Sequence, residues 1–90
     1  NGLVVCLLGV REIPKYREKA IVFLIVKFKL HKVFLKYDAQ KYNDNNELMC
    51  YIYLDNKTFV NNHLIRTGFV AVDERFDYSC KQKFLKSLPA

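Results

Sequence analysis

The stretch that decides the fold covers residues 51–72 and reads YIYLDNKTFVNNHLIRTGFVAV. Its first four residues are aromatic or branched apolar residues, which favour a β-strand. Asp55 and Asn56 come next and tolerate turn conformations. The following residues predict a short helix, and Gly68 is the residue type that most often ends one, before a second extended segment. This order of strand, turn, helix and strand indicates an α+β fold.

The short helix is predicted to span residues 60–67. Asn61 or Asn62 is expected to cap its N-terminus, and the Asn61 side chain is expected to bond to backbone groups rather than to a ligand. His63 and Arg66 are expected to face solvent. Three apolar residues at helical spacing are expected to be buried, namely Val60, Leu64 and Ile65.

The N-terminal part of the chain predicts one strand and one helix. Residues 3–10 are almost wholly apolar, as in a strand with both faces covered. Pro14 suits the first turn of a helix, and the segment after it, KYREKAIVFLIVKFK at 15–29, contains β-branched residues that also favour a strand. Helix is preferred because apolar residues recur at helical spacing, at Ala20, Phe23, Leu24 and Phe28. A further apolar face is expected to contact a parent domain, a partner or a second copy, and consists of Val22, Ile25 and Val26.

Two more strands and a helix are predicted after this segment. Residues 32–37 and 48–54 have the composition of strands, and the polar loop between them, at 38–46, is rich in turn formers. One face of the second strand is expected to carry Met49, Tyr51 and Tyr53, and the other Leu48, Cys50, Ile52 and Leu54. Residues 77–88 predict a last helix stopped by Pro89, whose apolar positions are Tyr78, Phe84, Leu85 and Leu88.

Composition and length limit what the chain can be. Ninety residues make one domain, and 51% hydrophobic and 14% aromatic residues are inconsistent with disorder. The longest uninterrupted apolar run, 20–26, is too short to cross a membrane, so no membrane partner is expected. Three widely separated cysteines and two isolated histidines predict neither a disulfide framework nor a metal site. Free thiols of this kind are typical of a reducing compartment, and the protein is expected to be cytoplasmic.

The balance of charge points to a polyanionic partner. Fifteen Lys and Arg residues against nine Asp and Glu residues give a net charge of +6 and a pI of about 9.3. Nucleic acid is the first partner that this suggests, and simple solubility is the competing explanation. The candidate nucleic-acid-binding residues are Lys27, Lys29, Lys32, Lys36, Arg11 and Tyr42. The aromatic residues that could stack on bases are Phe28, Phe34, Tyr37 and Tyr42.

Two motifs in this sequence resemble those of the staphylococcal-nuclease-like domain family. The family pattern "Y-x-Y-x-D/N-G-x-x-V-N-x-x-L-I-x-x-G" is matched at Tyr51, Tyr53, Val60, Asn61, Leu64, Ile65 and Gly68. The weaker pattern "R-L-I-G-I-D-x-P-E" is similar to the segment that contains Leu7, Leu8, Gly9, Val10 and Pro14. The resemblance extends over residues 3–85. It implies a partial OB-fold-like β-barrel with about three strands and two to three helices, in which the first two barrel strands are absent.

The same resemblance implies that the chain is a fragment of a larger multidomain protein. Parent-protein domains or a second copy are then expected to cover the open strand edges. It also implies that the family's catalytic site is degenerate. That site uses Ca²⁺ held by carboxylates, a glutamate near the attacking water and two arginines. Here Cys6 and Glu47 are at the positions of the arginines, Arg11 is at that of a metal-binding aspartate, and Lys15 is at that of the glutamate. A shift of one residue brings Glu12 to the metal position but restores neither arginine.

Three functions are consistent with these observations. The favoured one is a non-catalytic nuclease-like domain that binds DNA or RNA, or that positions a larger nucleic-acid-modifying protein, such as a DNA-modifying enzyme, on its substrate. The second is a protein-interaction or scaffold domain that uses the apolar helix face and the open strand edges. The third is an active nuclease that relies on Glu12, together with Asp38 or Asp44, for Ca²⁺ and on Arg11 as a phosphate clamp. Only the third requires a cofactor.

Overall fold

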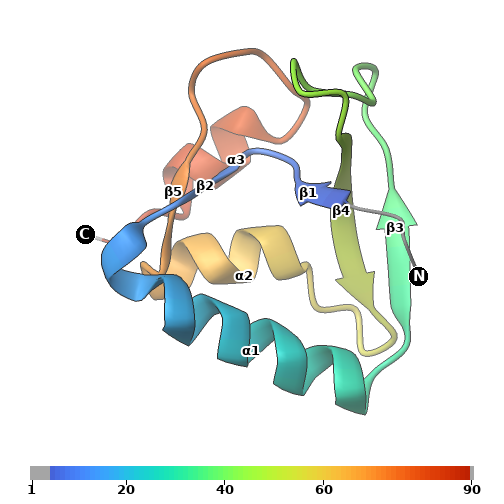
Figure 1. Cartoon of the computed structure of the whole chain (residues 1–90), viewed down its shortest axis with the longest axis vertical. Coiled ribbons are helices and arrows are strands. Elements are labelled where there is room, and N and C mark those ends of the chain that lie inside the picture. The colour runs from blue at the N-terminus through green and yellow to red at the C-terminus, as the bar shows by residue number, and fades with distance from the viewer. Residues whose placement is uncertain (1–4, 90) are drawn as a thin grey trace.

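The computed structural model of the chain describes residues 5–89 (Figure 1). In this part of the chain the strands are β1 Val5–Leu7, β2 Val10–Glu12, β3 Val33–Lys36, β4 Leu48–Leu54 and β5 Val70–Val72. The helices are the 3₁₀ turn η1 Pro14–Tyr16 and the α-helices α1 Arg17–Leu30, α2 Val60–Thr67 and α3 Lys81–Lys86. The predicted α+β class is therefore confirmed.

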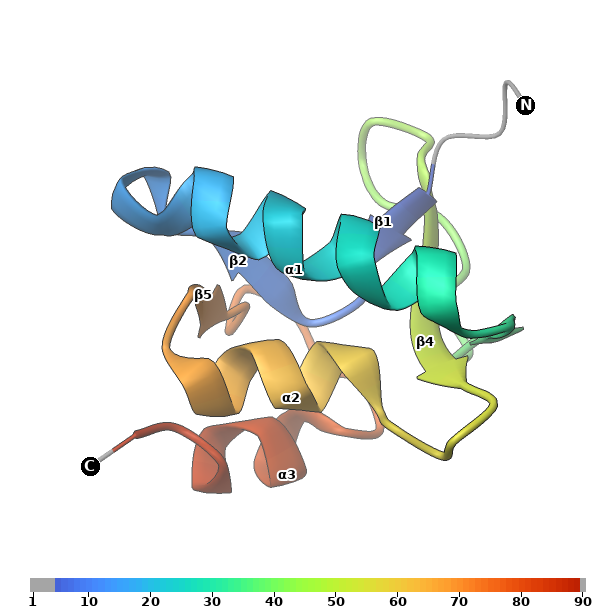
Figure 2. The same ribbon diagram turned by 90° about the horizontal axis from the view of Figure 1, so that it is seen from below.

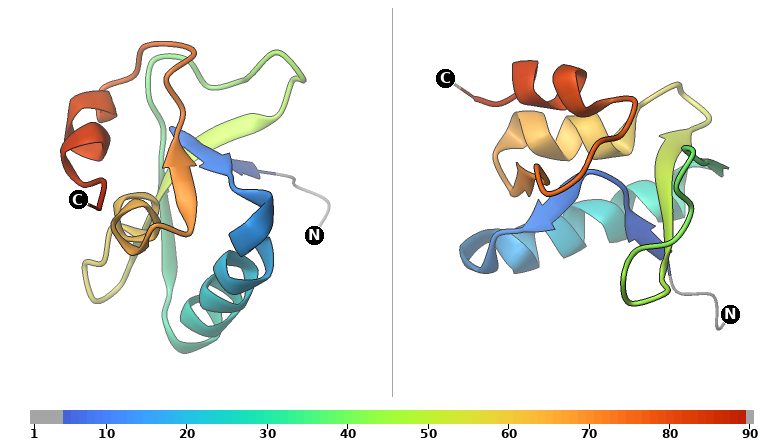
Figure 3. Two further views of the ribbon diagram at one scale, coloured as in Figure 1. Left: turned by 90° about the vertical axis from the view of Figure 1, so that its left-hand side faces the viewer. Right: turned by 90° about the horizontal axis from the view of Figure 1, so that it is seen from above.

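The strands form two small sheets. In the first, β4 lies between β1, which runs parallel to it, and β3, which runs antiparallel. In the second, β2 pairs with β5 in antiparallel orientation, with Val10 opposite Val72 (Figure 3). Within residues 5–89 the two sheets do not join into a closed barrel.

The prediction of one continuous strand at residues 3–10 is wrong over its described part. Gly9 has a φ of +80°, a conformation that residues with a side chain rarely adopt, and the chain turns there from β1 into β2. A Cβ atom at this position would also lie 2.6 Å from the ring of Phe84. The turn directs Val10, the last residue of the run, to β5, whereas Val5–Leu7 pair with β4. Residues 3 and 4 lie outside the described residues.

The helix α2 has the predicted bounds, but its N-terminus differs from the prediction. Gly68 ends the helix in a left-handed conformation with a φ of +81°, as expected. The N-cap position is occupied by Phe59, and no side chain caps the helix. Asn61 does not cap the helix because its amide points into the core, where it is fully buried.

The buried Asn61 amide connects α2 to the bend after β1 and to β4. Its Oδ1 accepts a hydrogen bond from the backbone N–H of Ile52 at 2.8 Å. Its Nδ2 donates to the carbonyl oxygens of Leu8 at 2.9 Å and Cys50 at 3.1 Å. The prediction that this side chain bonds to backbone groups is confirmed. These bonds satisfy backbone groups that water cannot reach.

The core lies around β4, α2, β5 and α3. Both faces of β4 are covered, and on one of them the ring of Tyr51 meets Phe59 and Phe84 at centroid distances of 5.7 and 6.2 Å. The predicted core positions on α2 are confirmed as buried. The largest fully buried side chains are Phe84, Leu8, Leu54, Leu64, Ile65, Val60, Asn61 and Cys50.

Three elements at the periphery, α3, β3 and α1, contribute few buried side chains. The helix α3 covers six residues of the predicted 77–88, with Phe84 buried and Leu88 exposed. All four residues of β3 are exposed. The helix α1 confirms the predicted helix, but it runs along the outside of the molecule beside α2 (Figure 2). Ala20 is its buried residue, and the prediction that Phe28 faces inward is wrong because that side chain is exposed.

The polar loop after β3 is fixed at its start by Asp38. Its Oδ2 accepts hydrogen bonds from the Tyr51 hydroxyl at 2.6 Å and from the Ser79 N–H at 2.7 Å, and its Oδ1 accepts from the Ser79 hydroxyl at 3.0 Å. The bond from Tyr51 is the main reason that the pKa of Asp38 falls to about 2. One carboxylate thus ties the loop to β4 and to the segment before α3.

Replacing Asn61 with Ala is expected to lower the free energy of unfolding by about 3 to 5 kcal/mol. The cost arises because the Ile52 N–H and the Leu8 carbonyl lose their partner inside the core. Urea denaturation measures it. The matched control is Asn62→Ala on the same helix, where a buried Oδ1 has no hydrogen-bond partner among the described residues. That change should cost less than about 1 kcal/mol, and equal losses from both variants would contradict the role of Asn61.

Asp38 is expected to make stability fall at acidic pH. Its pKa is about 2 in the folded chain against 3.8 for an ordinary aspartate. The folded state therefore gains stability from ionised Asp38 above about pH 4 and loses that stability as the pH falls through 2. After allowance for solvent screening the gain is about 1 kcal/mol. Denaturation curves at pH 2 to 5 for the protein and for Asp38→Asn should converge at the acid end, and parallel curves would contradict this linkage.

Candidate functional site

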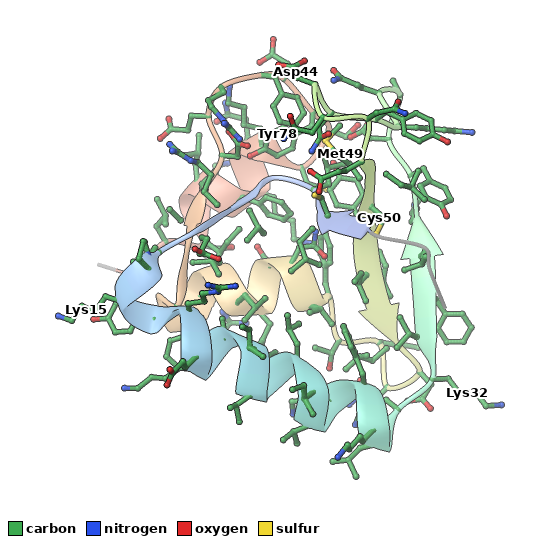
Figure 4. All side chains as sticks on the ribbon, viewed as in Figure 1. Lys15, Lys32, Asp44, Met49, Cys50 and Tyr78 are labelled. Carbon is green, nitrogen blue, oxygen red and sulfur yellow. The ribbon has the colours of Figure 1, made fainter. Side chains whose placement is uncertain are left out.

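A cleft of about 250 Å³ opens beside the end of β1, between the 38–46 loop and the segment after β5. The lining side chains include Cys6 of β1, Met49 of β4, Asn43 and Asp44 of the loop, and Asp73 and Arg75 of the segment after β5. Asp44 and Met49 are labelled at this end of the molecule in Figure 4. The parallel pairing of β1 with β4 places Cys6 opposite Met49, although the two residues are far apart in sequence.

Two of the degenerate catalytic positions, Cys6 and Glu47, meet beside this cleft. The Cys6 thiol donates a hydrogen bond to Glu47 Oε1 at a distance of 3.4 Å between sulfur and oxygen. Asn43 Nδ2 donates to the same oxygen at 2.9 Å. Both positions match arginines in the resemblance, so the structure has a thiol and a carboxylate in contact where a phosphate clamp would need two cations.

The protonation of this pair makes it unsuited to nucleophilic or phosphate chemistry. Burial, and then the neighbouring Glu47, raises the pKa of the Cys6 thiol above its ordinary value. The hydrogen bond from Asn43 is the main cause that lowers the pKa of Glu47. At neutral pH the thiol therefore stays protonated and the carboxylate stays charged. A fixed negative charge at this place repels a phosphodiester.

The other two degenerate positions lie apart from the cleft. Arg11 is exposed on β2, opposite Ala71. Lys15 is exposed in η1, with its Nζ 5.5 Å from the centroid of the Tyr16 ring. Figure 4 shows Lys15 at the end of the molecule near the start of α1. Cys6 and Glu47 are therefore beside the cleft, whereas Arg11 and Lys15 are on the surface away from it.

The residues of the active-nuclease alternative do not form a metal site. Glu12 pairs with Arg17 at 3.3 Å on the surface. Asp38 is held by Tyr51 and Ser79, while Asp44 lines the cleft. In the part of the chain that the structure describes, no group of three or more His, Cys, Asp or Glu side chains is placed to hold a metal ion.

An ion pair that the sequence reasoning missed forms the far wall of the cleft. Asp73 is buried, and its carboxylate accepts two hydrogen bonds from the Arg75 guanidinium, from Nε at 2.9 Å and from Nη2 at 2.7 Å. These bonds are the main cause that lowers the pKa of Asp73. The Asp73 N–H also donates to the Gly9 carbonyl at 2.8 Å. The only sequence signal was the D-x-R spacing, which is common in turns.

The six candidate nucleic-acid-binding residues do not form one face. Arg11 lies on β2, on the opposite side of Figure 1 from β3. Lys27 is half-buried. Its Nζ lies 5.5 Å from the centroid of the Phe23 ring, and the side chain therefore faces α2. His63, which was expected to face solvent, stacks on Phe23 at 5.1 Å, and burial, followed by the charge of Lys27, lowers its pKa. Arg66 is exposed, as expected.

The residues that do lie together follow one edge of β4. Lys32, Phe34 and Lys36 belong to β3 or to the residue before it, and β3 pairs with β4. After the intervening turn the chain returns to the same edge, where Tyr42 bridges to Leu48. We define the β3 strip as these basic and aromatic residues together with Tyr37 and Lys41 from the intervening turn, so that it consists of Lys32, Phe34, Lys36, Tyr37, Lys41 and Tyr42.

Every side chain of the β3 strip is exposed. Phe34 and Tyr42 are each 53% exposed and Tyr37 is 41% exposed, so these three rings have accessible faces. Lys41 Nζ lies 5.8 Å from the centroid of the Tyr37 ring. The strip therefore alternates cations and accessible ring faces along a single edge. Two carboxylates adjoin the strip, and both have partners: Asp38 accepts hydrogen bonds from Tyr51 and Ser79, and Asp55 accepts from the Lys32 N–H at 3.1 Å and pairs with His31.

The three cysteines are free thiols, and Cys50 is fully buried. Among residues 5–89, the helices are all too short or too polar to cross a membrane.

No protein-family model matches this chain, and no curated protein is similar enough to count as a match. The likeness to staphylococcal-nuclease-like domains therefore rests on the motif residues of the two sequence patterns.

Proposed function

We propose that this chain is a non-catalytic, staphylococcal-nuclease-like domain that binds single-stranded segments of DNA or RNA along the β3 strip. In this proposal its two sheets correspond to part of an OB-fold-like barrel. The observation that carries the proposal is the exposure of three aromatic rings between three lysines on one sheet edge. Such an edge offers both of the contacts that single strands use, ring faces for bases and cations for phosphates.

The energetics favour a single strand over a duplex. Stacking of a base on an aromatic side chain is worth about 1 to 3 kcal/mol, and it requires unpaired bases whose faces are accessible. Phe34, Tyr37 and Tyr42 offer ring faces of this kind. The lysines between them and the net charge of +6 add a non-specific attraction that weakens as salt rises. The domain can therefore hold a larger nucleic-acid-modifying protein, such as a DNA-modifying enzyme, on its substrate without chemistry of its own.

The protein-interaction function is the second candidate. It is favoured by one specific observation, the row of exposed apolar side chains on α1. This face and the β3 strip are made by different elements. The two functions are therefore compatible in one molecule.

The double variant Lys32→Glu/Lys36→Glu is expected to weaken binding of a fluorescent single-stranded oligonucleotide by at least about tenfold, because it removes two phosphate contacts. Fluorescence anisotropy at low and moderate salt measures this with DNA and with RNA. The matched control is Arg66→Glu/Lys86→Glu, which lowers the net charge equally at exposed positions on α2 and α3.

Phe34→Ala should weaken binding by about 5-fold to 100-fold through lost stacking. A circular dichroism spectrum should show that both β3 variants keep their fold. If the control pair weakens binding as much as the β3 pair, only net charge matters and the strip is not the site. Tighter binding of duplex DNA than of single strands would contradict the stacking argument.

Incubation with Ca²⁺ is expected to leave the bound nucleic acid intact, because Cys6 and Glu47 occupy the two positions matched to arginines and the described residues form no cluster of metal ligands. Gel electrophoresis of the labelled oligonucleotide after prolonged incubation, with and without Ca²⁺, measures cleavage. Cys6→Ala and Glu47→Ala provide the controls for the cleft. Ca²⁺-dependent cleavage that is lost in Glu47→Ala would show that this carboxylate acts in catalysis and would overturn the non-catalytic assignment.

A further inference from the structure

The helix α1 has an exposed apolar face that no other described element covers. Val22, Ile25 and Val26 are between 46% and 59% exposed, and Ile21 is 42% exposed. One side of α1 packs towards α2 through half-buried Phe23 and Leu24, and Figure 2 shows α1 at the margin of the molecule with α2 on one side only. Apolar side chains concentrated in this way on a surface mark an interaction site.

Charged residues of opposite sign lie at the two ends of this face. Residues 18, 22, 25 and 29 recur with the 4-3-4 spacing of a two-helix seam, which places Glu18, Val22, Ile25 and Lys29 in one row. Glu18 is in the first turn of α1 and Lys29 is in the last. Neither side chain forms an ion pair with another described residue.

This row is complementary to itself when it is reversed. In an antiparallel pair centred between residues 23 and 24, Val22 of one helix faces Ile25 of the other, and Glu18 faces Lys29 at both ends. Ile21 lies on one flank of the row and Val26 on the other, so in the antiparallel pair each residue is on the same flank as its own copy in the partner helix. A parallel pair would instead place Glu18 against Glu18 and Lys29 against Lys29, which costs energy. Antiparallel pairing also generates the closed two-fold symmetry that most small oligomers have.

We propose that a second copy of this chain docks on the α1 face, and that the two α1 helices form an antiparallel pair with Glu18 opposite Lys29. The pair does not use any residue of the β3 strip, so the dimer carries two such strips. A helix of 14 residues is about 21 Å long, and two of them bury less than a standard protein interface. The dimer is therefore weak, with assembly in the micromolar range or above.

Sedimentation equilibrium of the 90-residue chain, over a wide range of concentration, tests the proposal. The expected mass rises from 10.7 kDa towards twice that value. Val22→Ser/Ile25→Ser should keep the circular dichroism spectrum and remain monomeric, because both residues are exposed in one copy. Leu30→Ser is the matched control. Leu30 is 70% exposed but lies off the row, so this variant should dimerise like the parent.

Charge exchange identifies the partner as a second copy in antiparallel orientation. Glu18→Lys alone and Lys29→Glu alone should each weaken dimerisation by about fivefold or more, because like charges then meet at both ends. A mixture of the two single variants should recover the lost affinity, since opposite charges then meet at both ends. The double variant Glu18→Lys/Lys29→Glu should recover it as well.

Three results would overturn the proposal. A chain that is monomeric at every concentration would mean that something other than a second copy covers the face, and binding of that monomer to anionic lipid vesicles would assign the face to a membrane surface. A dimer that persists in Val22→Ser/Ile25→Ser would be built on another surface. Loss of affinity in the single variants without recovery in the mixture would exclude the antiparallel orientation.

Discussion

The rest of this structure depends on the buried amide of Asn61. It accepts from the Ile52 N–H in β4 and donates to the Leu8 carbonyl in the bend after β1. Two chain segments that are far apart in sequence thus share one side chain from α2. Each of these backbone groups is inside the core, where an unpaired donor or acceptor costs about 1 to 3 kcal/mol. Because these backbone groups need the Asn61 amide as their partner, they fix the position of α2 against the sheet. The core around Leu64 follows from that position.

The sequence predicted elements whose signal is local and missed features that depend on distant contacts. The bounds of β4 and α2, the end of α2 at Gly68 and the backbone bonds of Asn61 were all predicted correctly. The break at Gly9 was not, because it follows from pairing with β5 and from the approach of the Phe84 ring to 2.6 Å of a hypothetical Cβ. Local propensity gives no information about either contact.

At the candidate site, too, the residue types are known from the sequence, but their arrangement in space is not. Where the resemblance expects two arginines, the residue types of Cys6 and Glu47 can be read from the sequence, and neither carries a positive charge. Their contact at 3.4 Å, and the Asn43 amide that holds the carboxylate, required the folded chain. The Asp73–Arg75 pair was missed for a physical reason: its importance comes from the burial of the Asp73 carboxylate, and a short turn sequence does not reveal burial.

The exposed surfaces of α1 and β3 have one cause in common. A small chain buries little more than 60% of its surface, so it cannot cover every apolar element that it makes. Here the core is centred on β4, α2, β5 and Phe84, to which α1 contributes Ala20 and β3 contributes no buried residue. Their chemistry differs, because β3 alternates rings with lysines whereas the α1 row is apolar with one charge of each sign at its ends. A surface of alternating rings and cations suits a polyanion with flat bases, and a row that is complementary to its own reverse suits another copy of the same helix.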